Sequence, residues 1–202
     1  NILIVGGSGF LGFNLLLKFV NLKNFNIYSV SRNIPRKLKR LKKIKFIKAD
    51  FTKYSSLVKK LEKINFDIVI NFGGNIDHTN RLQTEKSHYK LCKNLVDFFK
   101  NKKIKLFLQA GSSLEYGKKK SPNKEIDKCR PNSIYGRSKL KSTEYLENSG
   151  LNFIVLRLYQ IYGPHQKINR IIPLAIFNLK KFSYFESTSG IQQRDFIHVD
   201  DL

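Results

Sequence analysis

The sequence predicts an α/β fold, a doubly wound parallel sheet with helices on both faces. Short apolar runs alternate with longer amphipathic or polar segments along most of the 202 residues, and this alternation is typical of parallel strands joined by crossover helices. The first apolar run leads directly into a glycine-rich turn and then a helical pattern. Hydrophobic residues make up 41% of the chain, which is enough for a substantial core at this length.

Six apolar runs have the length and composition of buried strands. Each holds four to six residues and is separated from the next by a polar or helical stretch. Apolar runs of this length are expected for strands covered on both faces. The expected strands are Ile2–Val5, Asn26–Val30, Lys45–Ala49, Ile68–Phe72, Lys105–Ala110 and Phe153–Leu158.

Four longer segments between these runs have helical periodicity. In the third, Leu91, Leu95 and Phe99 recur at helical spacing, so they are expected to face the core rather than a cofactor. Six strands with crossover helices make a Rossmann-like sheet the predicted architecture. The expected helices are Leu11–Leu22, Ser55–Ile64, Glu85–Asn101 and Ile134–Asn148.

The charge of the chain does not point to a nucleic-acid partner. There are 38 Lys and Arg against 15 Asp and Glu, a formal net charge of +23. Clustered cations beside aromatic side chains bind nucleic acid. Here the lysines are spread along the chain, and the densest run, residues 36–45, contains no aromatic residue.

The remaining composition predicts a cytoplasmic protein with no membrane partner and no metal site. No apolar run approaches the about 20 residues needed to cross a bilayer, and the first residues lack the charged start of a signal peptide. Cys92 and Cys129 do not have the spacing of metal ligands and are expected to be free thiols. Because the chain has no methionine and ends at "HVDDL" without a turn, we expect a fragment at both ends.

The glycine-rich turn "GGSGFLG", residues 6–12, predicts a bound dinucleotide. Glycines here allow a tight turn and a close approach of the backbone to a pyrophosphate at the N-terminus of the next helix. Two glycine spacings fit this turn. Gly7, Gly9 and Gly12 match G-x-G-x-x-G, and Gly6, Gly9 and Gly12 match G-x-x-G-x-x-G. The alternative is a turn without a ligand.

The end of the second expected strand favours NADP over NAD. An acidic residue about 20 residues after the glycines would bind the adenosine ribose of NAD, but the chain has Ser31 and Arg32 at this place. A guanidinium can hold the 2′-phosphate of NADP by charge-assisted hydrogen bonds. The alternative is that Arg32 is one more surface cation of a basic protein.

A second candidate site lies in "SIYGRSK", residues 133–139, where the last expected helix begins. Tyr135 and Lys139 are four residues apart and therefore share one helix face. A nearby ammonium favours the tyrosinate, which brings the pKa of a phenol, ordinarily about 10, toward the range of proton exchange. The spacing is common by chance, so its weight comes from its position at the head of the helix.

Six segments resemble, in order, those of the extended short-chain dehydrogenase/reductase family, the nucleotide-sugar epimerases, dehydratases and ketoreductases. They are the G-x-x-G-x-x-G turn, "KAD" ending at Asp50, "GSSLEYG" at 111–117, "YGRSK" at 135–139, "LRLYQIYGP" at 156–164 and "QQRDFIHVDDL" at 192–202. The resemblance covers essentially the whole chain. Family members are usually longer, which implies a missing C-terminal part.

The resemblance assigns roles by position. It implies that Tyr135 is the general acid and base, that Lys139 holds the nicotinamide ribose and lowers the pKa of Tyr135, and that Ser112 hydrogen-bonds the reacting oxygen. Ser113 is the alternative to Ser112 if the loop register differs by one. The implied cofactor-binding residues are Gly6, Gly9, Phe10, Leu11 and Gly12 at the pyrophosphate, Asp50 and Phe51 at the adenine, Gly73 beside the cofactor, and Ser31, Arg32, Tyr135 and Lys139.

The implied substrate residues are Ser112, Gln160 and Arg194. Arg194 would bind the phosphates of the sugar nucleotide, and its alternative is an ion pair with Asp195. Gln160 stands where many members have an Asn that contacts substrate, which puts the contact at this position in doubt.

One departure from the family disfavours dehydration. Family dehydratases carry an Asp-Glu pair directly after the hydroxyl residue, whereas this chain has Ser113 and Leu114. Leu114 cannot transfer a proton, and Glu115, one position further on, is expected to point elsewhere.

The predicted reaction is reversible hydride transfer between a nicotinamide cofactor and an alcohol carbon of a nucleotide-linked sugar. Arg32 favours an NADPH-dependent 4-ketoreductase acting on a 4-keto-6-deoxy sugar nucleotide, and an NAD-dependent 4-epimerase is the alternative. A catalytically inactive NADP- or RNA-binding protein is the alternative from another class. Residues 1–165 are expected to form the NAD(P)-binding domain, and residues 166–202 are expected to begin the substrate-binding region, parts of which are interleaved with the first domain. The expected assembly is a homodimer.

Overall fold

The computed structural model describes residues 1–75 and 79–202. The chain divides into two units, Asn1–Leu158 and Tyr159–Leu202, and each is described by itself. The expected boundary between cofactor-binding and substrate-binding parts, after residue 165, stays a prediction because ligand contacts define it.

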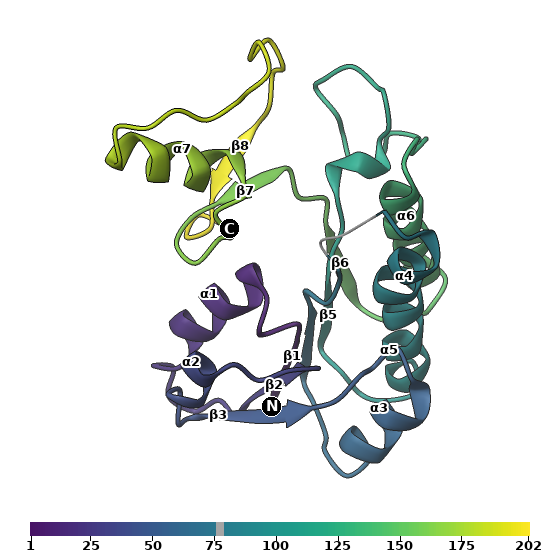
Figure 1. Ribbon diagram of the computed structural model, residues 1–202. Helices are drawn as coiled ribbons and strands as arrows, with labels where there is room; N and C mark the ends of the chain where they lie inside the picture. The colour runs from purple at the N-terminus through teal and green to yellow at the C-terminus, as the bar shows by residue number, and fades with distance from the viewer. Residues whose placement is uncertain (76–78) are drawn as a thin grey trace. The chain divides into compact units, whose positions relative to one another are not determined.

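A six-stranded parallel sheet forms the centre of the first unit (Figure 1). Its strands are β1 (Ile2–Val5), β2 (Ile27–Ser31), β3 (Ile44–Lys48), β4 (Ile68–Asn71), β5 (Leu106–Ala110) and β6 (Phe153–Leu156). The order is β3-β2-β1-β4-β5-β6, and every neighbouring pair is parallel. The strand order therefore reverses between β1 and β4. This is the doubly wound Rossmann order, so the predicted fold class is confirmed and all six expected strands are present.

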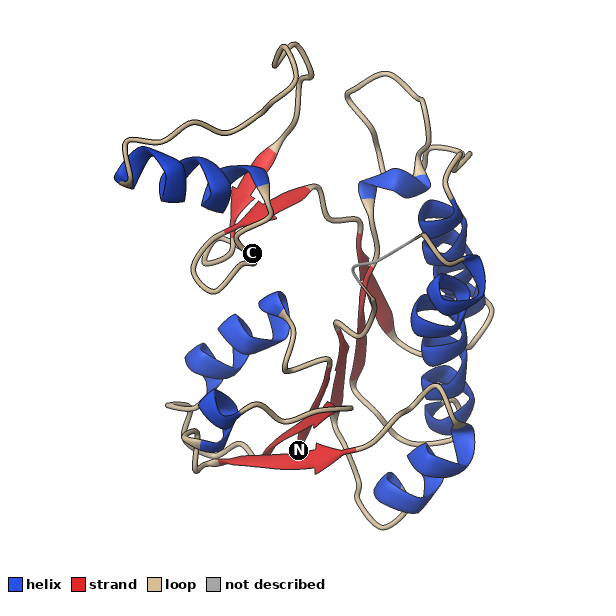
Figure 2. Ribbon diagram, in the orientation of Figure 1, coloured by secondary structure: helices blue, strands red, loops and turns tan. Residues whose placement is uncertain are grey.

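Helices cover both faces of this sheet (Figure 2). One face carries α1 (Phe10–Phe19) and α2 (Arg36–Lys39). The opposite face carries α3 (Tyr54–Leu61), α4 (Arg81–Glu85), a π-helical turn η1 (Lys86–Lys90), α5 (Leu91–Phe99) and α6 (Ile134–Glu147). A short 3-10 turn, η2 (Ser113–Glu115), follows β5.

The central strand β1 contributes to two separate cores. Leu3 and Val5 pack with residues of α3, α5 and α6, whereas Ile2 and Ile4 pack with residues of α1 and α2. Successive side chains of a strand point to opposite faces, and all four residues of β1 are buried. Helices on both faces therefore explain why this strand is apolar throughout.

The structure differs from the expected helices in two places. The helical segment expected at Glu85–Asn101 begins at Arg81, because the Asn80 side chain accepts a hydrogen bond from the Gln83 N–H at 3.0 Å and caps α4. The π-helical turn η1 then interrupts it. Short α2 was not predicted, since its four residues are basic apart from Leu38, which is fully buried and anchors the helix.

The second unit contains a small parallel pair of strands and one helix. β7 (Gln160–Tyr162) pairs with β8 (Phe196–His198), and α7 (Ile171–Lys180) lies between them in the sequence. The sequence did not predict α7, because its apolar residues surround the helix instead of forming one stripe. None of its residues is buried.

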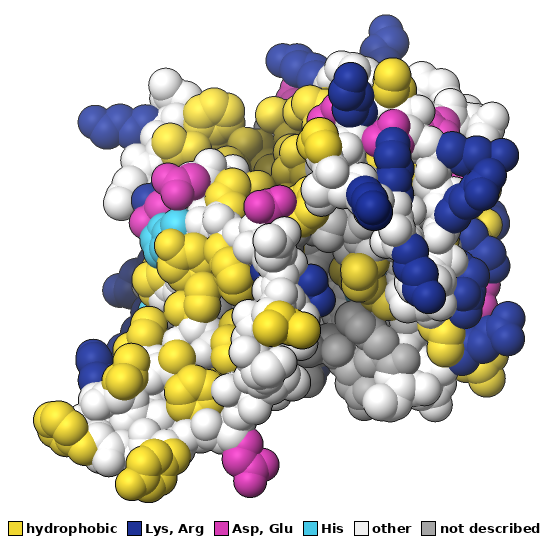
Figure 3. All heavy atoms as spheres, turned by 90° about the horizontal axis from the view of Figure 1, so that it is seen from above, with side chains coloured by type: hydrophobic (Ala, Val, Ile, Leu, Met, Phe, Trp, Pro, Cys, Tyr) yellow, Lys and Arg dark blue, Asp and Glu magenta, His cyan; other side chains and the backbone are white. Residues whose placement is uncertain are grey.

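Figure 3 shows one face of the molecule with all heavy atoms as spheres. On this face, hydrophobic side chains gather in some areas, and Lys and Arg side chains gather in another area.

None of the helices within the described ranges has the length and hydropathy that a membrane crossing requires.

Candidate active site

The glycine turn joins the end of β1 to the start of α1. Gly6 has φ +85°, and a Cβ there would lie 2.8 Å from the backbone nitrogen of Gly73, beyond β4. A Cβ at Gly12 would overlap the Gly6 carbonyl oxygen. Gly7 is also constrained, because a Cβ there would overlap the Ser29 hydroxyl of β2. The fold therefore requires the first glycine of both spacings, each for a different reason.

Gly9 is the N-cap of α1 and has an ordinary extended backbone, with φ −76° and ψ 174°. Among the described residues outside its chain neighbours and α1, a Cβ there would have one neighbour within 4 Å, the Gly6 carbonyl oxygen at 3.2 Å. No side chain of the described residues caps this end of α1, and its first turn contains no acidic residue. Phe10 and Leu11, the first two residues of the helix, are partly buried. The N–H groups of this first turn can therefore hold a pyrophosphate.

Ser31, at the end of β2, holds the glycine turn. Its Oγ accepts a hydrogen bond from the Ser8 N–H at 3.0 Å and donates to the Val30 carbonyl at 2.8 Å. Arg32 is exposed, and its charge acts on Asp50. Of this pair, Arg32 is therefore the one with a side chain that can reach a ligand.

Asp50 and Phe51 follow β3, and their side chains have different surroundings. The Asp50 carboxylate accepts hydrogen bonds from the Thr52 N–H and hydroxyl, at 3.0 and 2.7 Å. Burial opposes ionisation of Asp50, but these bonds and the charges of Arg32 and Lys86 outweigh it and lower its pKa. The Phe51 side chain is buried in the core, so only its backbone is placed to contact an adenine.

Gly73 lies directly after β4, where the strand order reverses. Its N–H donates to the Asn71 side chain at 3.0 Å, and a Cβ there would overlap the Leu91 side chain. The end of β4 is thereby held close to Gly6 and the glycine turn.

Tyr135 and Lys139 lie in the first turns of α6, whose N-cap Ser133 accepts a hydrogen bond from the Gly136 N–H at 3.0 Å. The Lys139 side chain is buried, and its Nζ donates to the Ala110 carbonyl at 2.6 Å. The same Nζ lies 5.8 Å from the centroid of the Tyr135 ring. Burial lowers the pKa of Lys139 to about 8, although the charge of Glu115 opposes the shift.

Ser112 follows the same strand end that holds Lys139. It is the N-cap of η2, and its Oγ accepts a hydrogen bond from the Leu114 N–H at 3.2 Å. An acceptor role there leaves the hydroxyl hydrogen able to donate to a reacting oxygen. Ser113 is half-buried, and its N–H donates to the Leu158 carbonyl at 2.9 Å.

Two residues near this site were missed or set aside by sequence reasoning. His88 lies in the π-helical turn, and its ring packs edge-on against Tyr135, with centroids 4.9 Å apart and an interplanar angle of 79°. Glu115, expected to point elsewhere, is fully buried and accepts the Ser112 N–H at 2.8 Å. The S-x-x-E spacing from Ser112 to Glu115 is a capping box, a local signal that could have placed Glu115 at the site. No sequence spacing links His88 to Tyr135, because their contact joins segments far apart in the chain.

The two expected substrate residues of the second unit are on its surface. The Gln160 side chain is exposed in β7, and its N–H donates to the Asp195 carbonyl at 3.1 Å. Arg194 is exposed, and its Nη1 donates to the Gln193 carbonyl at 2.8 Å. Among the described residues, Arg194 forms no ion pair with Asp195. Their substrate roles stay predictions.

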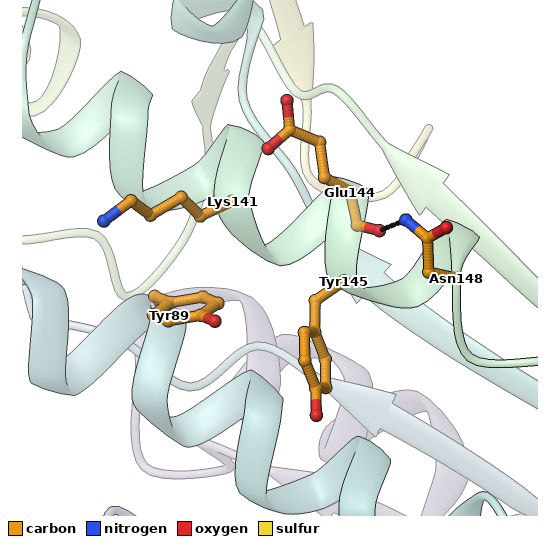
Figure 4. A pocket seen from close by; sticks show the side chains of 5 residues that line it. All are labelled: Tyr89, Lys141, Glu144, Tyr145 and Asn148. Atoms are coloured by element: carbon orange, nitrogen blue, oxygen red, sulfur yellow. Dashed lines mark hydrogen bonds between the residues drawn. The ribbon is translucent and has the colours of Figure 1, made fainter.

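A hollow of about 280 Å³ lies on the outer side of η1 and α6 (Figure 4). The Tyr89 and Tyr145 rings meet edge-on there with centroids 6.1 Å apart. The hollow contains none of the residues expected to bind cofactor or substrate. It is lined by Tyr89, Lys141, Glu144, Tyr145 and Asn148.

Comparisons with known proteins identify relatives of this chain. It is 28% identical to the ADP-L-glycero-D-manno-heptose-6-epimerase of Brachyspira hyodysenteriae and 28% identical to the dTDP-4-dehydro-6-deoxyglucose reductase of Escherichia coli. Each match covers 100% of this chain and 69% of the relative. A solved structure of a UDP-glucuronic acid 4-epimerase variant from Bacillus cereus matches with a TM-score of 0.87 at 21% identity, over 99% of this chain and 69% of that one.

The likeness to the solved structure concerns the fold, whereas the sequence match to a family model decides membership. The model of the NAD dependent epimerase/dehydratase family matches residues 2–202. This span includes the glycine turn, the Ser112 turn and the head of α6. The chain belongs to the NAD dependent epimerase/dehydratase family.

Proposed function

We propose that this protein catalyses hydride transfer between a nicotinamide cofactor and an alcohol carbon of a nucleotide-linked sugar. The observation that supports this most is buried Lys139, whose Nζ is bound to the Ala110 carbonyl at 2.6 Å and lies 5.8 Å from the Tyr135 ring centroid. An ammonium at this place favours the ionised phenol. The substrate class follows from the relatives, whose names describe enzymes of nucleotide sugars.

The residues at the end of β1 fit a dinucleotide. The uncapped first turn of α1 offers N–H groups to the pyrophosphate, and Gly9 leaves room for its close approach. The related structure from Bacillus cereus is in complex with NAD and UDP-4-deoxy-4-fluoro-glucuronic acid. When bound, the nicotinamide ring gives or accepts the hydride.

The residues of the chain supply the proton chemistry. The Tyr135 phenol gives a proton to the sugar oxygen during reduction and takes it back during oxidation. The Ser112 hydroxyl donates a hydrogen bond to that oxygen and stabilises the charge that develops on it. Lys139 holds the nicotinamide ribose and keeps a positive charge beside Tyr135. Leu114 is 47% exposed and has no proton to transfer, so the chain lacks a dehydratase acid at this position.

Within this class, the NADPH-dependent 4-ketoreductase is our first choice. Arg32 is exposed at the end of β2, where its guanidinium can pair with a 2′-phosphate. The relative from Escherichia coli is a reductase of a 4-dehydro-6-deoxy sugar nucleotide. The second candidate is an NAD-dependent epimerase, which the names of the other two relatives favour.

The test is NADPH oxidation by the purified protein with a 4-keto-6-deoxy sugar nucleotide. Stoichiometric loss of NADPH and formation of the 6-deoxy sugar nucleotide are expected. A copurified NAD that is restored in each turnover, together with an epimerised product, would favour the second candidate instead.

A Tyr135→Phe variant separates both enzymes from an inactive binding protein. Loss of the phenolic proton is expected to lower kcat by about 10² to 10⁴-fold, while cofactor affinity changes little because the ring remains. Unchanged activity of every kind in this variant would contradict the enzymatic proposal.

A further inference from the structure

Glu115 carries a fully buried carboxylate that joins three segments of the first unit. It accepts hydrogen bonds from the Ser112 N–H at 2.8 Å and from the Thr143 hydroxyl at 2.9 Å. Arg157, directly after β6, forms an ion pair with it through Nε at 3.2 Å. A buried charge lowers the stability of the fold unless it is paired and hydrogen-bonded. Here each carboxylate oxygen of Glu115 has partners. The arrangement is therefore a fixed junction rather than a surface contact.

Two of these contacts lead to residues of the candidate active site. The Ser112 N–H belongs to the residue whose hydroxyl is proposed above to hydrogen-bond the reacting oxygen. Thr143 lies one helical turn after Lys139 on α6, and its hydroxyl also contacts the Lys139 carbonyl at 3.4 Å. The strand end leaves room for the carboxylate at Gly111, where a Cβ would lie 2.7 Å from the Glu115 Oε1.

Arg157 completes the junction on its other side. Its Nη1 donates to the Glu125 carbonyl at 2.8 Å and to the Tyr116 hydroxyl at 3.4 Å, and its guanidinium lies 5.0 Å from the Tyr116 ring centroid. These contacts fix the long loop that leads from η2 to α6. They would remain if Glu115 lost its charge.

The charges around Lys139 come from few groups. Glu115 favours its ammonium form, and Cys92 of α5 would act in the same direction only as a thiolate. Burial raises the pKa of Cys92 to about 12, so this thiol stays neutral at physiological pH. The Tyr135 ring lies on the same helix face, with His88 packed against it. Among the described residues, Glu115 is thus the carboxylate that acts on Lys139, and its oxygens are held by Ser112, Thr143 and Arg157.

We propose that Glu115 is a positioning residue, which holds the Ser112 turn against α6 and supplies the counter-charge that keeps Lys139 an ammonium. The proposal rests on the function proposed above, because it gives Lys139 a charge that the reaction uses. Glu115 acts through Ser112 and Lys139 and makes no contact with the sugar.

The test compares the wild-type protein with Glu115→Gln, which keeps the shape and an acceptor for the Ser112 N–H but removes the charge. Glu147→Gln is the matched control, because Glu147 is exposed at the end of the same helix α6. Lysine side chains labelled with ¹³C at Cε are followed by NMR across pH. The Lys139 signal is identified by its absence from Lys139→Arg.

The wild-type Lys139 is expected to titrate near pH 8. In Glu115→Gln its midpoint moves to lower pH, because removal of a negative charge disfavours the ammonium. The alkaline limb of the kcat profile moves in the same direction, and Glu147→Gln leaves both measurements unchanged. An unchanged Lys139 midpoint in folded Glu115→Gln would overturn the proposal.

A second variant covers the case in which Glu115→Gln does not fold because Arg157 is left unpaired. The double variant Glu115→Gln with Arg157→Gln removes both charges, and it is expected to show a smaller downward shift of the Lys139 midpoint, because Arg157 lies farther from Lys139 than the carboxylate it pairs with and its loss offsets part of the effect. If neither variant folds, Glu115 serves stability alone and the proposal fails. If the midpoint shifts but the wild-type protein transfers no hydride to any sugar nucleotide, the proposal for Glu115 stands and the proposed function fails.

Discussion

The glycine turn allows a prediction that separates the needs of the fold from those of the cofactor. Gly12→Ala places a methyl group over the Gly6 carbonyl oxygen and 2.7 Å from the Gly7 Cα. Both neighbours are backbone, so the turn must shift. Overpacking of this kind costs about 1–3 kcal/mol, and we take the upper end because backbone cannot rotate away. Alanine offsets about 1 kcal/mol of this cost because it is a better helix former than glycine. The free energy of unfolding is therefore expected to fall by about 2 kcal/mol.

For a protein of this size, a loss of about 2 kcal/mol lowers Tm by roughly 4–8 °C. The decrease is expected without cofactor, since the overlap lies within the protein. Thermal unfolding followed by circular dichroism measures it. A Gly12→Ala variant with the Tm of the wild-type protein would show that the turn relaxes freely and would refute the reasoning.

Gly9→Ala is the matched partner of this variant. Its backbone is extended, which alanine adopts readily, and the Gly6 carbonyl oxygen, 3.2 Å from the new methyl group, must move by a few tenths of an ångström. Loss of the favourable N-cap glycine costs about 1 kcal/mol at most. The methyl group instead occupies the approach to the α1 N-terminus. We expect at least about tenfold weaker cofactor binding, or about 1.4 kcal/mol.

Fluorescence of the reduced nicotinamide measures this affinity, and the chain contains no Trp to interfere. Wild-type affinity in Gly9→Ala would show that the cofactor phosphates do not lie at this helix end. The predicted pyrophosphate site would then be wrong even if Gly12→Ala behaved as expected.

Three further predictions concern the other site residues. Arg32→Ala is expected to weaken NADPH binding by about tenfold or more and NADH binding little, because a charge-assisted hydrogen bond contributes about 1.5–3 kcal/mol; equal effects on both cofactors would contradict the NADP preference. Ser112→Ala is expected to lower kcat by at least tenfold and Ser113→Ala to change it little, with the opposite ranking showing that the loop register differs by one. Burial lowers the pKa of Lys139 to about 8 from 10.5. Between these values the unfolded chain binds the extra proton, so the free energy of unfolding should rise with pH relative to Lys139→Met; a parallel pH dependence in the two proteins would contradict the burial of this charge.

The sheet could be predicted from the sequence because the signal for each strand lies within the residues of that strand. Each strand is a short segment rich in apolar residues, and β1 is apolar throughout because it is covered on both faces. The π-helical turn and α7 were not predicted. The first depends on the backbone path between Glu85 and Leu91, and the second has apolar residues on every side.

The same contrast applies to the candidate site. The spacing of Tyr135 and Lys139 in one helix predicts a shared face, and the structure places the Lys139 Nζ near the Tyr135 ring. The partner of that ammonium, the Ala110 carbonyl, lies 29 residues away in the sequence. Glu115 contacts Ser112 through a local capping box with S-x-x-E spacing. Its contacts with Thr143 and Arg157, and the contact of His88 with Tyr135, join segments far apart in the sequence. Long-range contacts of this kind leave no periodic signal.

The two glycine spacings show why a sequence pattern alone does not identify the residue that meets the ligand. Gly6 is required by its positive φ and by the end of β4, and Gly7 by a side chain of β2. Both are therefore fixed by the protein whether or not a cofactor binds. Gly9 is the glycine that the protein itself constrains least, with one backbone neighbour at 3.2 Å and an ordinary φ. Since the fold accounts for the missing side chain least at Gly9, this is the position of the turn where we expect the bound phosphate to lie.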